Sequence, residues 1–104
     1  MIKACVSLKE NKYNGFTCSG HAGYGYKGND IVCAAVSTLV INTANAIEKF
    51  TDCNFKSENK GDEIVYKFDE IPDEKASLLM DTLVLGLKEI QKEYGKKYLD
   101  LVIK

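Results

Sequence analysis

The sequence predicts an α+β domain in which two helices pack on a mainly antiparallel sheet, and three observations indicate this class. Hydrophobic residues recur at every second position in short segments and at helical spacing in two long ones. The predicted elements follow in the order ββαββαβ. No repeat, low-complexity tract or linker interrupts the 104 residues, so residues 1–104 are expected to form a single domain.

The first two elements are predicted to be paired strands. From Ile2 to Leu8, hydrophobic residues occupy every second position, as a half-buried strand requires. Turn-forming residues follow at 11–15, and residues 16–19 have the composition of a second short strand. The two strands are therefore expected to form a hairpin.

A helix is predicted from Asn29 or Asp30, either of which provides a cap, to Phe50. No residue between Ile31 and Ile47 carries a charge, yet the segment is too polar and too short to cross a membrane. A helix with so little charge is expected to be covered on more than one side. Burial between the sheet and the second helix, or at a subunit interface, fits the sequence equally well.

A second hairpin is predicted after Cys53. Short strands at 54–56 and 64–68 flank a turn region at 57–62 that contains Gly61. In the later strand, three hydrophobic residues would share one face: Ile64, Tyr66 and Phe68.

The second helix is predicted to begin at Pro72 and Asp73 and to end at Gly95. A hydrophobic stripe at helical spacing runs along it, formed by Ala76, Leu79, Met80, Leu83, Leu87, Ile90 and Tyr94. A last strand from Tyr98 to Ile103 completes the sheet.

The charge balance excludes some classes of function. Lys and Arg total 14 and Asp and Glu total 15, which gives a formal net charge of −1. This provides no basic surface for wrapping nucleic acid, so no direct nucleic-acid binding is expected. The amino-terminal segment lacks the features of a secretory signal, and we therefore expect a cytoplasmic protein that binds no membrane.

The sequence contains four cysteines and a single histidine. Cytoplasmic proteins normally keep their thiols reduced, and no spacing typical of a zinc site is present, so neither disulfides nor a metal are expected. Cys5, Cys18 and Cys53 lie in or beside predicted strands and are interpreted as structural thiols.

The most unusual segment is rich in glycine and contains the only histidine. Gly23, Gly25 and Gly28 match the G-x-G-x-x-G pattern that precedes a helix in dinucleotide-binding proteins. That interpretation is disfavoured, because the following helix leads into a hairpin instead of a parallel βαβ unit. A structural crossover loop remains an alternative.

Cys33 differs from the other cysteines because it lies in the first turn of the predicted helix. Free backbone N–H groups and the helix dipole stabilise a thiolate there, and the same groups can bind an oxyanion. The glycine-rich loop can bring His21 close enough to act as a general base. The residues alone leave a Cys/His pair and an ordinary structural role both open.

Residues 20–23 (GHAG) and 30–37 (DIVCAAVS) resemble the signature of the ribosomal-processing cysteine protease family called Prp. The length and the ββαββαβ order also agree with that family. The resemblance implies that Cys33 is the nucleophile and His21 the general base of a cysteine endopeptidase, with an acyl-enzyme intermediate and no metal or organic cofactor. It further implies a homodimer that removes the amino-terminal extension from the precursor of large-subunit ribosomal protein twenty-seven.

Other residues of the signature are interpreted as supporting the site. Gly20 precedes the histidine, Asp30 would cap the helix or orient His21, and Ser37 would line the pocket one turn after Cys33. The segment between them is expected to act as a lid, whose residues are Gly23, Tyr24, Gly25, Tyr26 and Gly28.

Two other functions remain compatible with the sequence. One is a non-catalytic, ribosome-associated module that holds a protein tail in the same groove. The other is a thiol redox sensor that uses Cys33 and a neighbouring cysteine.

Overall fold

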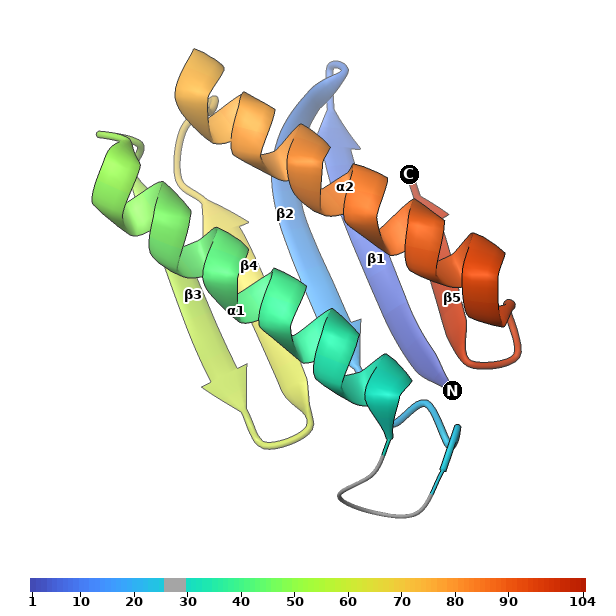
Figure 1. Cartoon of the computed structure of the whole chain (residues 1–104). Helices are drawn as coiled ribbons and strands as arrows, with labels where there is room; N and C mark the ends of the chain where they lie inside the picture. The colour runs from blue at the N-terminus through green and yellow to red at the C-terminus, as the bar shows by residue number, and fades with distance from the viewer. Residues whose placement is uncertain (26–29) are drawn as a thin grey trace.

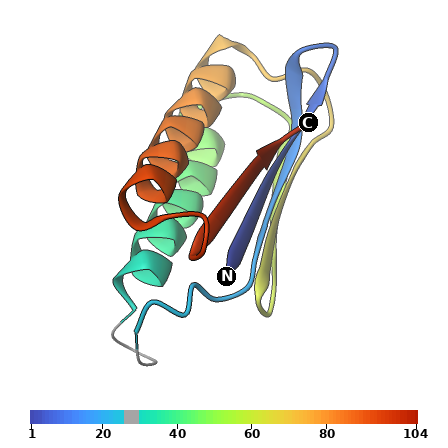
Figure 2. The same cartoon turned by 90° about the vertical axis from the view of Figure 1, so that its right-hand side faces the viewer.

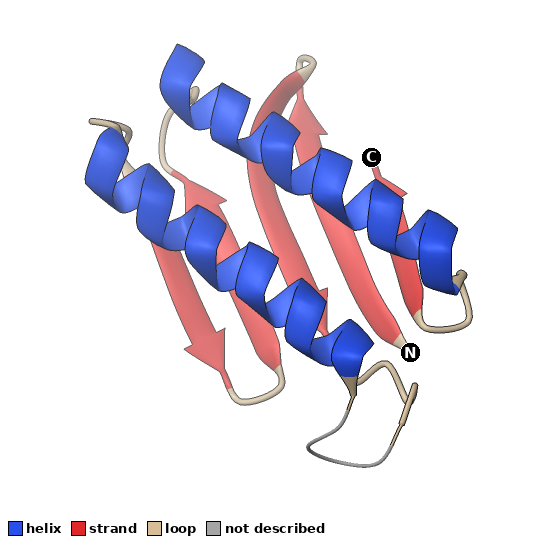
Figure 3. Ribbon diagram, viewed as in Figure 1, coloured by secondary structure: helices blue, strands red, loops and turns tan. Residues whose placement is uncertain are grey.

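The computed structural model describes residues 1–25 and 30–104. Across these residues, two helices lie side by side on one face of a five-stranded sheet, as Figure 1 and Figure 3 show. Seen from the side, the helices form one layer and the sheet the other (Figure 2). The elements are β1 (Ile2–Lys9), β2 (Lys12–Ser19), α1 (Ile31–Phe50), β3 (Phe55–Lys60), β4 (Glu63–Phe68), α2 (Glu74–Tyr94) and β5 (Leu99–Ile103).

The strand order confirms a mainly antiparallel sheet. The strands are arranged β3-β4-β2-β1-β5, and only the β1–β5 pair is parallel in the part of the chain that the structure describes. β5 reaches its place beside β1 because α2 crosses over the sheet first, which is the usual route to a parallel pair. The predicted ββαββαβ order is also confirmed.

The first hairpin is longer than predicted. β2 begins at Lys12, whereas the sequence predicted a turn over 11–15, and the turn itself consists of Glu10 and Asn11 with positive φ angles of 52° and 63°. The register shifts between Ser7 and Leu8, which pair with Gly15 and Tyr13. The turn-like residues of β2 are thus accommodated by a bulge within the strand.

The second hairpin also differs from its prediction. β3 extends through Lys60, so most of the predicted turn at 57–62 belongs to a strand, and only Gly61 and Asp62 connect it to β4. β3 has the composition of a loop because it is an edge strand with largely exposed side chains. Charged residues protect such edges from pairing with other chains.

Asp30 caps α1, and the helix ends at Phe50 as predicted. One side of α1 packs into the core through Val32, Val36, Val40, Thr43, Ala44 and Ile47. The opposite side is exposed, including Ile31 and Ile41, which are 53% and 47% accessible. α1 is the one described helix that is long and apolar enough to cross a membrane, but its packing against the sheet equally fits a core helix.

α2 confirms its prediction closely. Asp73 is the N-cap and Gly95 is the C-cap. Of the predicted stripe, four residues are buried (Ala76, Met80, Leu83 and Leu87) and three are partly buried (Leu79, Ile90 and Tyr94). Residues from both helices and from the inner face of the sheet form one hydrophobic core, in which Phe16 and Tyr66 contact each other with ring centroids 5.0 Å apart. The Tyr66 hydroxyl donates to the Val40 carbonyl oxygen, which ties α1 to β4.

Candidate active site

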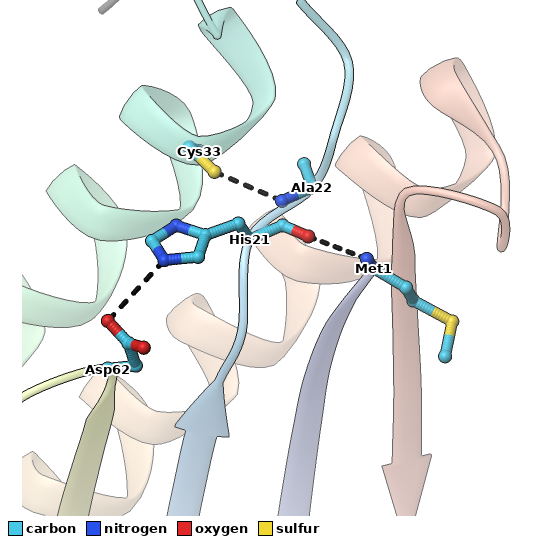
Figure 4. A network of polar contacts seen from close by, with 5 residues as sticks. All are labelled: Met1, His21, Ala22, Cys33 and Asp62. Carbon is cyan, nitrogen blue, oxygen red and sulfur yellow. Dashed lines mark hydrogen bonds and ion pairs between the residues drawn. The ribbon is translucent and has the colours of Figure 1, made fainter. Parts of the chain in front are cut away.

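Cys33 lies in the first turn of α1, and its sulfur is directed toward the chain that leaves β2. The backbone N–H of Ala22 donates a hydrogen bond to Cys33 Sγ across 3.1 Å (Figure 4). Ala22 is buried and follows His21 directly, so this contact brings the histidine and the cysteine segments together. The predicted proximity of these two segments is therefore present in the fold.

The two carboxylate oxygens of Asp30 accept hydrogen bonds from different segments, one from the start of α1 and the other from the loop. One oxygen, Oδ1, accepts hydrogen bonds from the backbone N–H groups of Val32 and Cys33, each at 3.0 Å. The other, Oδ2, accepts from the Tyr24 N–H at 3.0 Å. These bonds, above all the one from Cys33, lower the pKa of the Asp30 carboxyl. Asp30 is thus the cap of α1 and an anchor for the loop.

The same contacts correct one expectation from the sequence. The backbone N–H groups around Cys33 were expected to be free to bind an oxyanion, but those of Val32 and Cys33 already bond to Asp30. The sulfur of Cys33 receives its hydrogen bond from Ala22 instead. Of the two roles considered for Asp30, the structure shows the cap, and the described hydrogen bonds of its side chain do not include His21.

His21 pairs with a residue that sequence reasoning did not identify. Its Nε2 lies 3.4 Å from Asp62 Oδ1, and both side chains are about three-quarters exposed. Figure 4 shows the imidazole ring between the Cys33 and Asp62 sides of the site, with Nε2 toward Asp62. Among the described residues, no hydrogen bond joins the ring directly to the Cys33 sulfur. Asp62 follows a glycine in a short turn, a pattern that signals a hairpin and nothing catalytic.

Backbone contacts fix the chain on both sides of His21. The Gly20 N–H donates to the Asp62 carbonyl oxygen at 3.3 Å, and the Met1 nitrogen donates to the His21 carbonyl oxygen at 2.6 Å. Gly20 has a φ of +91°, and a Cβ there would lie 2.6 Å from the Met1 carbonyl oxygen. Only glycine fits this position without a shift of the backbone.

A groove of about 220 Å³ lies beside the two residues. Both His21 and Cys33 line it, as does Ser37, which lies one turn further along α1. Its other lining residues are both hydrophobic and polar: Ile2, Cys18, Ser19, Gly20, Val36, Val40, Ile41, Asn59, Gly61, Asp62 and Ile64.

The other three cysteines occupy different environments. Cys18 lines the same groove but is only 8% exposed, and burial together with the nearby Cys33 raises its pKa to about 11. Burial also raises the pKa of Cys53, which lies beyond the far end of α1. Cys5 is half-buried in β1. Cys33 is therefore the cysteine that combines a helix start, the groove and the histidine segment.

The predicted lid is described only in part. Tyr24 packs edge-on against Tyr94 and Tyr98, with ring centroids 5.2 Å and 5.0 Å away, and does not line the groove. Its backbone is held by Asp30, as described above. Tyr26 and Gly28 lie outside the described residues, so the lid stays a prediction.

The sequence comparisons point to one protease family. A family model described as cysteine protease Prp matches residues 1–99. The ribosomal processing cysteine protease Prp of Staphylococcus aureus is 34% identical over 101 residues, which cover 92% of this chain and 93% of that protein. The protein of the same name in Bacillus subtilis is 29% identical over 105 residues, with 90% of each chain covered.

Solved structures agree with this result. A crystal structure of the ribosomal processing protease Prp from S. aureus with a covalently linked product peptide matches with a TM-score of 0.93 at 26% identity, and 100% of each chain is covered. SMU.848 from Streptococcus mutans matches with a TM-score of 0.81 at 31% identity, covering 99% of this chain and 93% of that one.

Proposed function

This chain belongs to the cysteine protease Prp family, and we propose that it removes the amino-terminal extension from the precursor of large-subunit ribosomal protein twenty-seven. Cys33 is the proposed nucleophile and His21 the proposed general base. The observation that carries this assignment is the Ala22–Cys33 hydrogen bond, because it places the nucleophile's sulfur beside the residue that follows the histidine. The S. aureus relative with its covalently linked product peptide supports a peptide as the bound substrate.

The proposed reaction proceeds through an acyl-enzyme. The Cys33 thiol transfers its proton to the imidazole while the sulfur forms a bond to the carbonyl carbon of the scissile peptide. The C–N bond then breaks, and the imidazolium returns the proton to the leaving amine. Water loses a proton to His21 and attacks the thioester, the C–S bond breaks, and the carboxylic product is released. The imidazolium returns its proton to the sulfur, which restores the Cys33 thiol.

The developing oxyanion needs a donor, and the described contacts favour Ala22. The N–H groups of Val32 and Cys33 are occupied by Asp30, whereas the Ala22 N–H points at the reacting sulfur. When the sulfur bonds to the substrate carbon, the carbonyl oxygen comes close to the same N–H. Backbone donors aimed at such an oxygen stabilise the transition state strongly.

We also propose that the protein acts as a cytoplasmic homodimer. Support comes from α1, whose exposed side includes Ile31 and Ile41 and carries no charge from Ile31 to Ile47. Uncharged, partly apolar helix faces are typical of surfaces that become covered on association. This favours the subunit interface among the two explanations for the low charge of the helix.

The experiment that tests the function is incubation of the reduced protein with the full-length precursor, followed by identification of the new amino terminus. We expect one new terminus after the extension. Precursor that stays intact while it binds the protein would overturn the protease assignment and favour a non-catalytic module that holds a protein tail. Cleavage that persists in Cys33→Ala would overturn the assignment of the nucleophile.

A further inference from the structure

We propose that Asp62 is a positioning residue for His21, a role that rests on the proposed function and goes beyond its two catalytic residues. Asp62 Oδ1 lies 3.4 Å from His21 Nε2. A carboxylate there accepts the Nε2–H of a neutral imidazole, which leaves the lone pair on Nδ1. Asp62 thereby selects the tautomer in which Nδ1 faces the Cys33 side and can take the thiol proton.

The backbone holds Asp62 in this place. β2 and β4 pair in antiparallel register with Ser19 opposite Glu63, and the next bond in this ladder joins the Gly20 N–H to the Asp62 carbonyl oxygen at 3.3 Å. Asp62 therefore takes part in the last backbone bond of the ladder, and His21 is one residue beyond Gly20, its partner in that bond. Gly61, with a φ of +67°, is the first residue of the two-residue turn before β4, and this turn places Asp62 beside the end of β2.

The nearest lysine does not compete with His21 for the Asp62 carboxylate. Lys60, the nearest cation along the chain, pairs with Glu58 with its Nζ 3.2 Å from Oε2. Within residues 1–25 and 30–104, the ion pair recorded for Asp62 is the one with His21. The carboxylate is thus available to orient the imidazole.

The pair is exposed in the free protein, where water weakens such contacts. Both residues line the groove beside Cys33, so a peptide bound there would cover them. Removal of water strengthens the interaction between a carboxylate and an imidazole or imidazolium. The effect of Asp62 is therefore expected in the chemical step, with little effect on peptide binding.

Asp62→Ala and Asp62→Asn test this role, with Glu63→Gln as the matched control. The control removes one negative charge from the adjacent residue, whose side chain makes none of the ion pairs recorded for the described part of the chain. We expect kcat to fall about 10-fold to 100-fold in Asp62→Ala, by less in Asp62→Asn, which keeps an acceptor oxygen, and not at all in Glu63→Gln. KM should stay within about twofold. An unchanged kcat in Asp62→Ala would overturn the proposal.

A second readout does not depend on activity. Because His21 is the only histidine, ¹⁵N NMR of the labelled protein reports its tautomer without assignment by mutagenesis. We expect the Nε2–H form to dominate at a pH where the ring is neutral, and Asp62→Ala to shift the ring toward a mixture. The same tautomer ratio in both proteins would overturn the proposal. If the protein cleaves no precursor but the ratio changes as expected, the proposed function fails while the positioning by Asp62 stands.

Discussion

The backbone N–H of Ala22 donates a hydrogen bond to the sulfur of Cys33 across 3.1 Å. This contact crosses from the end of β2 to the start of α1, two segments separated along the chain by the glycine-rich loop. It links the proposed nucleophile to the residue after His21 without involving the imidazole. The ring itself pairs with Asp62, and its position relative to Cys33 depends on the backbone around residues 20–22.

Asp30 is predicted to support both the helix and the loop. Asp30→Ala removes the cap and the Tyr24 anchor, and we expect it to lower Tm by roughly 4–8 °C and to reduce kcat/KM. Asp30→Ser is the matched variant, because one hydroxyl oxygen can cap α1 but cannot also hold the loop. It should restore most of Tm and little of kcat/KM. Equal recovery of both would contradict a separate anchoring role.

Gly20→Ala is predicted to damage activity more than Gly23→Ala. Both glycines have a positive φ, but a Cβ at Gly20 would lie 2.6 Å from the Met1 carbonyl oxygen, whereas a Cβ at Gly23 would meet nothing within 4 Å. The first substitution must shift the backbone that carries His21. We expect kcat/KM to fall by about tenfold or more beyond the loss in Gly23→Ala. Steady-state kinetics would measure this, and similar losses in the two variants would refute the steric explanation.

Cys18 is predicted to make stability fall at alkaline pH. Its pKa is raised from 9.0 to about 11 by burial, so above pH 9 the unfolded chain binds fewer protons than the folded one. The free energy of unfolding should therefore decrease between about pH 9 and pH 11, by about 3 kcal/mol in total from this residue. Urea unfolding of the wild type and of Cys18→Ala at pH 8 and pH 10 measures the difference.

The control for this experiment is the residual pH dependence of Cys18→Ala. Burial also raises the pKa of Tyr66 and Tyr13, so both proteins should lose stability at the highest pH. The variant should show a shallower decline between pH 8 and pH 10. Identical slopes in the two proteins would mean that the Cys18 thiol is not shielded from water as its 8% exposure indicates.

The exposed side of α1 is predicted to form the dimer interface. Thr38→Glu places a charge on this exposed side, at a residue that does not itself line the groove. Light scattering should give twice the 11.6 kDa chain mass for the wild type and a lower mass for the variant. Glu89→Lys, an exposed charge change on α2, is the control. A wild-type mass equal to that of one chain would contradict the dimer.

Much of the fold could be predicted from local patterns, because caps and periodicity depend on neighbouring residues. Asp30, Asp73 and Gly95 mark the helix ends that the structure shows. The limits of β2 and β3 could not be predicted, since a bulge and an exposed edge permit turn-like and charged residues inside strands.

Only part of the candidate site could be predicted from local sequence patterns. Cys33 could be selected from its place at the helix start and His21 as the single histidine in the glycine-rich segment, whereas Ser37 came from the resemblance to the family signature. Asp62 could not, because its link to His21 arises from the pairing of β2 with β4, strands separated by an entire helix. The occupation of the α1 N–H groups by Asp30 follows from a capping pattern that the sequence contains, but its effect on the oxyanion site required the geometry.

The central claim is that the Cys33 sulfur forms a covalent bond to the substrate's carbonyl carbon. The most direct test is intact mass spectrometry of the protein mixed with its precursor and quenched in acid at short times, followed by peptide mapping. We predict an adduct with the mass of the cleaved extension minus water, mapped to the peptide that contains Cys33 and absent from Cys33→Ala. Cleavage of the precursor by Cys33→Ala, which cannot form this adduct, would contradict the account, and so would an adduct mapped to Cys18.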